Sequence, residues 1–371
     1  MNVYIYECVN NVFVKLDVID SYKSLIWIKR YQALGECELY IAATETLMKL
    51  FQKPHIFLVR EDDPESMMMV TTLELQTDPE GMDYLIVKGQ AAERVLGQRI
   101  TWGQMTIATG TNGAAAEILI NANLTDVSRP TGTAPSIVER RQRRGMPFVK
   151  LGEVVHAGSG FRAQLDSENL LDVVLKICVD GGIGLRSRFV DGYIYIDIYI
   201  GKDRTISQSV NERVIFSPDY ENIGKTSYLY DMTQIATMAV VLGEGQGSAR
   251  ERPRVEPTEE SGIDLFEIKI DASNISRTTT DGEMPQAEYI ECLTQEGKMQ
   301  LAQRKVKRSF EGEIVTQQMY VCGESYDLGD KVTVQNEYGL TGSAVVMEIS
   351  DVIDDTGRQI YPTLSEWALE E

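Results

Sequence analysis

The sequence predicts an α+β fold in which strands predominate. Most apolar residues lie in short runs between turn residues, helical periodicity is confined to a few segments, and the C-terminal stretch alternates with period 2. In that stretch Val332 and Val334 face one way while Lys331, Thr333 and Gln335 face the other, as in a half-buried strand. These three observations favour antiparallel sheets joined by tight turns.

Residues 1–103 are expected to form mainly short strands around one helix. Thr44 is the expected cap of that helix, which covers 45–52, and Pro54 stops it. Several short strands around a single helix are typical of a small antiparallel barrel. The expected strands are 2–9, 12–19, 24–31, 55–60, 67–76 and 82–89.

Residues 104–205 differ in character from the first stretch. A helix is expected at 112–122, and a second helix is expected to begin at Ser167 as its cap and to end at Gly181-Gly182. One face of this second helix is apolar and carries Leu170, Leu171, Val174, Leu175 and Cys178.

A hairpin is then expected, with arms 184–190 and 193–200 around Asp191-Gly192. In the second arm, Tyr193, Tyr195 and Tyr199 share a face with Asp197. Such a row could stack on sugars, but strands more often use tyrosine for packing between neighbouring strands.

The C-terminal part returns to extended runs between 214 and 243, followed by a polar loop at 243–262 and a strand at 265–270. A helix is expected at about 285–307. Leu328-Gly329-Asp330 is predicted to form a tight turn, because Gly accepts positive φ and Asp bonds back to the backbone. The remaining expectations are a hairpin of 331–335 with 340–349 across 336–339, a turn at 354–357 and a strand at 359–363.

Charge and length limit the class of protein. The chain has 371 residues and a net charge of −20. This length suggests two or three core-forming units. The acidic balance argues against a general nucleic-acid binder, which needs basic surface, and fits a particle component or a channel that DNA must pass without sticking.

The sequence gives no sign of secretion or membrane insertion. No apolar run approaches the roughly 18–20 residues that span a bilayer, and the N-terminus lacks the pattern of a signal peptide. The five cysteines are scattered, so reduced and mostly buried thiols are expected. They are Cys8, Cys37, Cys178, Cys292 and Cys322.

The two histidines stand outside any catalytic or metal-binding pattern. His55 and His156 have no partner at metal-ligand spacing and are interpreted as structural or surface residues. Gly158-Ser159-Gly160 lacks the outer spacing of a nucleophile elbow. Residues 243–247 match only the first two glycines of a phosphate-binding loop and are interpreted as a bent connector.

No catalytic, cofactor-binding or metal-binding residue is therefore assigned, and no cofactor is expected. Asp351, Asp354 and Asp355 are interpreted as turn residues, while a glycosidase pair, which is defined by distance in space, stays open. The basic run Arg140, Arg141, Arg143 and Arg144 is interpreted as a solvated loop, with contact to an acidic neighbour or to DNA as the alternative.

Several pieces, in order, resemble the hub proteins of phage tail tips. The similarity is to short siphophage tail proteins, which are related to the N-terminal structural part of longer Tal-like proteins. The pieces are residues 19–27, 29–31, 35–40, 59–63, 169–174, 214–218, 243–247 and 310–362.

The resemblance implies two similar antiparallel β-barrel domains with smaller α/β domains inserted. The first barrel would comprise 1–103 plus 206–245, and the second 246–275 plus 308–371. Residues 104–205 would be an inserted α/β domain and 276–307 a helical insertion.

The resemblance also implies a structural, non-enzymatic hub in the virion tail tip (baseplate), made and assembled in the host cytoplasm. A homotrimer would adapt the six-fold tail tube or distal tail protein to a three-fold fibre, spike or lysin, with a tape measure protein as a further partner and DNA passing through the lumen. Two alternatives remain: a glycan-active enzyme of the cell wall or exopolysaccharide, and a carbohydrate-binding adhesin.

Overall fold

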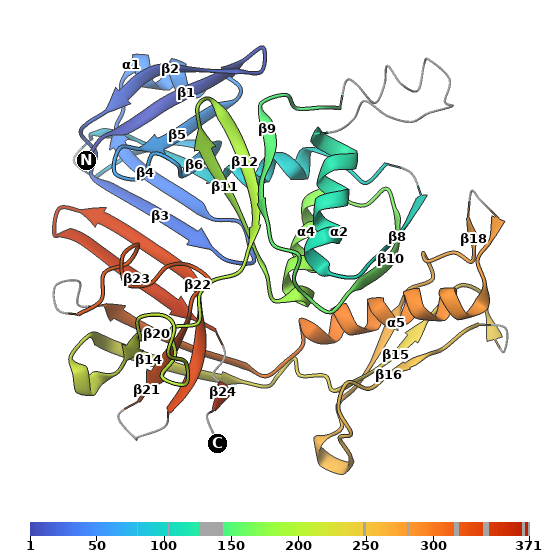
Figure 1. The fold of residues 1–371 in the computed structure, drawn as a ribbon. Coiled ribbons are helices and arrows are strands. Elements are labelled where there is room, and N and C mark those ends of the chain that lie inside the picture. Colours follow the sequence, from blue (N-terminus) through green and yellow to red (C-terminus); the bar gives the residue numbers. More distant parts are fainter. Residues whose placement is uncertain are drawn as a thin grey trace.

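The computed structural model describes residues 1–79, 81–102, 104–125, 144–247, 250–279, 282–314, 319–336, 341–365 and 368–369. Its N-terminal part is a set of strands with one short helix and a 3-10 segment (Figure 1). In order these are β1 (Val3–Val9), β2 (Val12–Ile19), β3 (Ser24–Arg30), β4 (Glu36–Ala42), α1 (Glu45–Phe51), β5 (Ile56–Arg60), β6 (Met67–Thr77), β7 (Asp83–Ala91) and η1 (Ala92–Gln98).

The middle part packs two helices against short sheets. Its elements are β8 (Gln104–Thr109), α2 (Asn112–Ile120), η2 (Asn121–Thr125), β9 (Val149–Val154), β10 (Phe161–Asp166), α4 (Leu170–Gly181), β11 (Gly184–Val190) and β12 (Tyr193–Tyr199). Strands β11, β12 and β9 form one sheet, and β10 pairs with β8 in another.

The C-terminal part is again mostly strands, with one long helix. It starts with β13 (Ile215–Phe216), η3 (Pro218–Tyr220), β14 (Ile223–Asp231), β15 (Met238–Leu242), β16 (Arg254–Val255), η5 (Gly262–Asp264), β17 (Glu267–Asp271), β18 (Thr278–Thr279) and β19 (Gly282–Glu283). It continues with α5 (Gln286–Ala302), β20 (Lys307–Ile314), β21 (Lys331–Gln335), β22 (Thr341–Asp354), β23 (Gly357–Leu364) and β24 (Ala368–Leu369).

One sheet of 14 strands joins the two ends of the chain. Its main path is β14-β20-β23-β22-β3-β4-β7-β6-β5-β1-β2, while β21 and β24 attach to β22 and β13 attaches to β21. In Figure 1 the blue N-terminal strands lie above the red C-terminal strands, with β3 and β22 at the boundary. The predominance of strands is confirmed.

The large sheet differs from the expected pair of closed barrels. Strand pairing within the described ranges closes into no ring. The physical reason is β22, which pairs first with β21 and β24, then with β23 on one side and β3 on the other. One shared strand therefore merges the two parts into a single open path. β14, which lies in the stretch grouped with the first barrel, pairs with β20.

Helix ends follow local chemistry, with one correction. Thr44 accepts from the Leu47 N–H and caps α1, as predicted. The cap of α4 is Asn169, not Ser167, because the Asn169 side chain accepts from the N–H groups at Leu171 and Asp172. Gly182, at φ +62°, ends this helix as expected. The long helix α5 ends at Ala302, before the predicted end at 307.

Tight turns and hairpins were predicted from their residues and are confirmed. The hairpin β11–β12 and the hairpin β21–β22 form as expected, and residues 354–357 lead from β22 into β23. Gly329 takes φ +87° in the Leu-Gly-Asp turn, where an added Cβ would lie 2.5 Å from the Tyr31 ring. Residues 337–340 of the hairpin loop lie outside the described part of the chain.

Candidate functional site at the junction of the sheet

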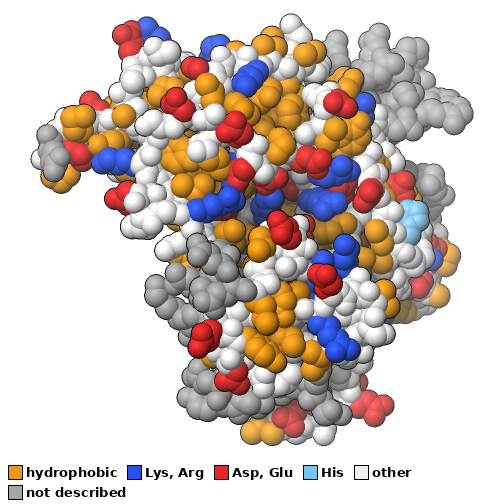
Figure 2. All heavy atoms as spheres, turned by 60° about the vertical axis from the view of Figure 1, so that its left-hand side comes forward, with side chains coloured by type: hydrophobic (Ala, Val, Ile, Leu, Met, Phe, Trp, Pro, Cys, Tyr) orange, Lys and Arg blue, Asp and Glu red, His pale blue; other side chains and the backbone are white. Residues whose placement is uncertain are grey.

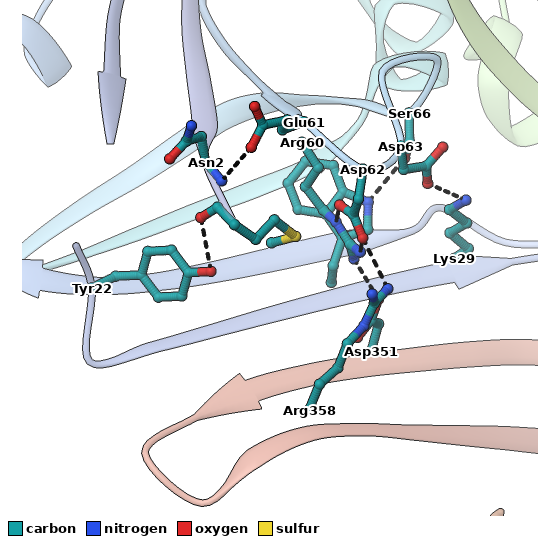
Figure 3. A network of polar contacts seen from close by, with 12 residues as sticks. Asn2, Tyr22, Lys29, Arg60, Glu61, Asp62, Asp63, Ser66, Asp351 and Arg358 are labelled. Carbon is teal, nitrogen blue, oxygen red and sulfur yellow. Dashed lines mark hydrogen bonds and ion pairs between the residues drawn. The ribbon is translucent and has the colours of Figure 1, made fainter. Parts of the chain in front are cut away.

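Two arginines and two aspartates join the N-terminal and C-terminal parts of the large sheet (Figure 3). Arg60 ends β5 and Asp62 follows it, whereas Asp351 lies in β22 and Arg358 in β23. The side chains of Arg60 and Asp351 are buried, at 3% and 9% exposure, so the centre of the network is shielded from water. We refer to these four residues as the charged junction.

Each of the four charged groups in the junction contacts two groups of opposite charge. Arg60 donates to both oxygens of Asp62, at 2.9 and 2.6 Å, and its Nη1 lies 2.7 Å from Asp351 Oδ2. Arg358 donates to both oxygens of Asp351, at 2.9 and 2.5 Å, and its Nη2 lies 3.0 Å from Asp62 Oδ2. Paired planar contacts of this kind fix direction as well as distance.

Strand register brings these residues together. The β22–β3 ladder places Asp351 opposite Trp27, and the Arg60 guanidinium lies 5.7 Å from the Trp27 ring centre. The Trp27 indole donates to Ser66 Oγ at 2.9 Å. On the other side, Asp351 is opposite Ile360, which sets Arg358 diagonally across β22 and β23.

The electrostatics of the junction favour the ionised forms. Burial alone would raise the pKa of Asp62, but the hydrogen bond and charge of Arg60, with the charge of Arg358, outweigh it and hold that pKa below its usual value. The hydrogen bond from Arg358 to Asp351 raises the pKa of Arg358. The four side chains therefore link the two parts of the sheet in one network of ion pairs.

The same boundary carries further ion pairs. Arg30 and Glu348 are directly opposite across β3 and β22, with Nε and Oε2 2.5 Å apart. Lys29 also contacts Asp63. Figure 2, which turns this side of the molecule forward, shows basic and acidic side chains gathered in a band between apolar areas.

A second buried carboxylate ties the middle part to the Leu-Gly-Asp turn. Asp330 is 3% exposed and accepts from the Lys202 N–H at 2.7 Å, from Arg204 Nε at 2.6 Å and from the Asp327 N–H at 3.1 Å. This carboxylate holds the segment that leaves β12 against the start of β21. The turn predicted from sequence is thus also a contact point between parts.

The predicted tyrosine row does not form one exposed surface. Tyr199 is 8% exposed and packs edge-on against Tyr31, with ring centres 5.3 Å apart. The Lys150 ammonium lies over Tyr193 at 3.3 Å and near Tyr195 at 5.6 Å. Asp197, on the same strand, is buried and accepts from Arg186 and Arg188.

The other residues weighed from sequence are dispersed over the fold. His55 immediately precedes β5 with φ +59°, and His156 contacts Glu117 at 2.8 Å on the surface. Glu244 lies in the stretch 243–247 that was interpreted as a bent connector. It accepts hydrogen bonds from Ser276 Oγ and the Arg277 N–H, which join this connector to the segment before β18. Asp354 accepts from the Thr356 N–H in its predicted turn.

The interpretation of Asp351 as a turn residue is wrong. Asp351 lies within β22, because the ladder continues to Asp354 before the chain reverses. Arg60 and Arg358 were not singled out from sequence either. The available signal was the arginine that ends the otherwise apolar run Ile56–Arg60, all of which is buried.

The basic run is only partly described. Residues 140–143 lie outside the described part of the chain, whereas Arg144 lies 4.6 Å from the Trp102 ring and donates to the Ile100 carbonyl. Over the described ranges, no group of three or more His, Cys, Asp or Glu side chains is placed to hold a metal ion. Within the same ranges, no helix is both long and apolar enough to cross a bilayer.

Comparison with solved structures identifies a phage tail protein fold. The 43 kDa tail protein of prophage MuSo2 from Shewanella oneidensis is 12% identical with a TM-score of 0.54, covering 98% of this chain and 97% of that one. The tail protein from Neisseria meningitidis MC58 is 11% identical with a TM-score of 0.52, covering 98% and 96%. Prophage tail protein gp18 from Listeria monocytogenes EGD-e is 10% identical with a TM-score of 0.53, covering 99% and 94%.

Residues 2–364 match the family described as Siphovirus ReqiPepy6 Gp37-like protein, and the chain belongs to this family. No curated protein matches the chain. The resemblance to siphophage tail proteins is therefore confirmed.

Proposed function

We propose that this chain is the hub of a siphophage tail tip, in which three copies form a ring. The ring adapts the six-fold tail tube or distal tail protein to a three-fold fibre, spike or lysin, which attaches the particle to its host. The observation that carries the proposal is the family match over residues 2–364, nearly the whole chain.

The charged junction supports this proposal physically. A subunit that offers two parts of one sheet to a ring must keep those parts at a constant angle, since three copies then present six parts. Buried, doubly paired charges such as Arg60 and Asp351 supply directional contacts at that boundary.

The proposed division of the chain keeps residues 104–205 and 276–307 as insertions. Residues 1–103 form the first ring part and 308–371 the second, whereas β16 and β17, in the stretch 246–275 expected to join the second part, pair with β15 in a separate three-stranded sheet. Residues 206–245 were grouped with the first part, and β14 moves to the second because it pairs with β20.

The proposed ring surrounds the DNA path without binding it specifically. The net charge of −20 would keep DNA from adhering during ejection. The chain acts as a structural component without a catalytic reaction or cofactor, and it takes its place in the tail tip during assembly in the host cytoplasm. A tape measure protein is a further proposed neighbour.

Light scattering on the purified full chain and electron microscopy of labelled particles test the proposal. We expect the mass of a trimer in solution and a label at the tail tip, on the three-fold axis. A single copy at the periphery of the particle would contradict the proposal.

A further inference from the structure

A pocket lies at the seam between the N-terminal sheet and the middle part of the chain. It encloses about 340 Å³, at the lower end of the roughly 300–1,000 Å³ of typical ligand pockets. Its walls come from the tip of the β1–β2 hairpin, the start of β5, β6, η1 and the residues before β9. In Figure 1 the β1–β2 hairpin lies near the top of the view.

The deepest side chains of the seam pocket are apolar, whereas polar residues, among them Asn10, Asn11, His55 and Gln98, supply most of its accessible lining. Phe57, Val95 and Met146 line it and are 2%, 1% and 5% exposed. Phe13 packs edge-on beneath, with its ring centre 5.1 Å from that of Phe57 and 5.5 Å from that of Phe148. A branched aliphatic side chain entering this space would exchange water for close-packed contacts.

The rim of the seam pocket carries one cation, the guanidinium of Arg99. Arg99 donates from Nε to the Arg144 carbonyl at 2.7 Å and from Nη1 to the Gln98 carbonyl at 2.9 Å. No carboxylate of the described residues pairs with it, and burial alone lowers its pKa. A half-buried arginine whose hydrogen bonds go to carbonyl groups would pair more strongly with a carboxylate, so Arg99 favours an acidic occupant.

The chain itself presents a matching knob. Ile263, in η5 between β16 and β17, is 90% exposed, and Glu259, Glu260 and Asp264 beside it are exposed as well. Gly262 takes φ +63° and holds the isoleucine at the tip of the turn. Figure 1 shows the loop between β16 and β17 projecting at the lower edge of the view, far from the β1–β2 hairpin at the top.

We propose that the seam pocket receives Ile263 from a second copy of the chain, with Arg99 pairing to a carboxylate beside that isoleucine. The contact joins two different surfaces, so it propagates head to tail and closes a ring when the rotation allows it. This inference rests on the proposed function, since it names the contact through which the copies in the ring meet.

A second exposed loop, which carries Val210, shows that exposure of an aliphatic side chain is not sufficient to fit the pocket. Val210 is also 90% exposed, but its loop carries Glu212 next to Arg213 and thus no excess of negative charge. The acidic loop at 256–264 could offer a carboxylate to Arg99, whose hydrogen bonds within the described residues go to carbonyl groups, and the loop around Val210 carries no such excess of acid. Val210 therefore serves as the matched control.

Disulfide trapping tests the contact in the full-length chain. Cys8 lines the seam pocket, so Ile263→Cys should form covalent multimers under mild oxidation, visible on a non-reducing gel. Adding Cys8→Ser should abolish them, and Val210→Cys should give none. Multimers that persist with Cys8→Ser, or that fail to form although the copies associate, would overturn the inference.

Affinity measurements give a second readout. Ile263→Asp should raise the dissociation constant for self-association about 10- to 100-fold, as expected for losing one buried aliphatic side chain, while Val210→Asp should change it little. Arg99→Glu should weaken association, and Asp264→Arg should restore part of it. Melting curves of each variant show whether the fold is intact.

The two proposals fail in different ways. If Ile263→Asp leaves a trimer of unchanged affinity, the proposed contact of Ile263 with the seam pocket is wrong, while the proposed trimeric ring is not contradicted. If the unaltered chain is a monomer both in solution and in the particle, the ring is wrong, and the knob contact falls with it.

Discussion

Gly201 and Gly329 approach so closely that a Cβ on Gly201 would lie 2.0 Å from the Gly329 carbonyl oxygen. The contact brings the segment after β12 against the Leu-Gly-Asp turn, next to the Asp330 carboxylate that binds the Lys202 N–H. Two backbones meet here without side chains between them, and neither has room to move aside.

Gly201→Ala should therefore destabilise the protein by at least about 2 kcal/mol, because backbone atoms would have to shift to admit one methyl group. Urea unfolding measures the change. Gly110→Ala is the control, since a Cβ there meets no atom within 4 Å, and it should cost far less. Equal effects of the two substitutions would show that the close approach is not what limits Gly201.

Arg60→Leu should destabilise the fold by roughly 3 kcal/mol, because it breaks a buried ion pair and leaves carboxylates without their partner. Thermal or urea unfolding of the full chain reports this loss. Lys49→Ala removes an exposed pair with Glu45 on α1 and should change stability by less than about 0.5 kcal/mol. If Arg60→Leu were as mild as Lys49→Ala, the junction would not hold the sheet together.

Asp197 predicts a loss of stability in acid. Burial alone would raise its pKa, but hydrogen bonds from Arg188, the Glu153 N–H and Arg186 outweigh burial and hold the folded pKa below the ordinary 3.8. The unfolded chain then binds the proton more readily, so the contribution is complete above about pH 4 and disappears as pH falls through the folded pKa.

Urea unfolding between pH 7 and pH 2.5 should therefore show a steeper fall for the unaltered chain than for Asp197→Asn. Asp191→Asn, in the exposed turn of the same hairpin, should keep the steep fall. A parallel pH dependence in Asp197→Asn and the unaltered chain would count against this assignment.

Gln164 predicts a substitution that does not weaken the fold. Its side chain is 5% exposed, and neither its amide nitrogen nor its amide oxygen has a hydrogen-bond partner among the residues that the structure describes. Gln164→Met should be neutral or stabilise by about 1 kcal/mol, because it removes a buried polar group that makes no bond. A loss of more than about 1 kcal/mol on thermal unfolding would mean that the amide is bonded in solution, for example to water.

Asn169→Ala should lower stability by about 1 kcal/mol, since its side chain caps α4 through two N–H groups. Ser167→Ala should have little effect, because the serine lies before the helix start. Circular dichroism during urea unfolding distinguishes the two. A larger loss of stability for Ser167→Ala than for Asn169→Ala would identify Ser167 as the cap instead.

Local features of the fold followed from sequence, and distant pairings did not. Thr44, Gly182 and Gly329 act within a few residues of themselves, so their types alone predict a cap, a helix end and a turn. The pairing of β22 with β3 joins residues more than 300 positions apart, and no local pattern encodes it. Two β-barrels were expected from the resemblance to tail-tip hub proteins, and the sharing of β22, which joins both parts in one sheet, has no signature in the sequence.

The candidate site was missed for the same reason. Arg60 and Asp351 become partners only through that distant pairing, and Asp351 lies close in sequence to Asp354 and Asp355, which resemble a turn. The tyrosine row was recognised as a strand face, but the burial of Tyr199 against Tyr31 depends on where the hairpin docks. Periodicity gives the face of a strand and not what covers it.

The single long strand β22 has a mechanical consequence. Rotating one part of the sheet against the other requires bending or unpairing a strand of 14 residues that both parts share. A force applied to one part of the sheet is therefore transmitted to the other part, because the shared strand makes the two parts move together. In a tail tip, such stiffness would let an event at the cell surface be felt at the tube without being absorbed on the way.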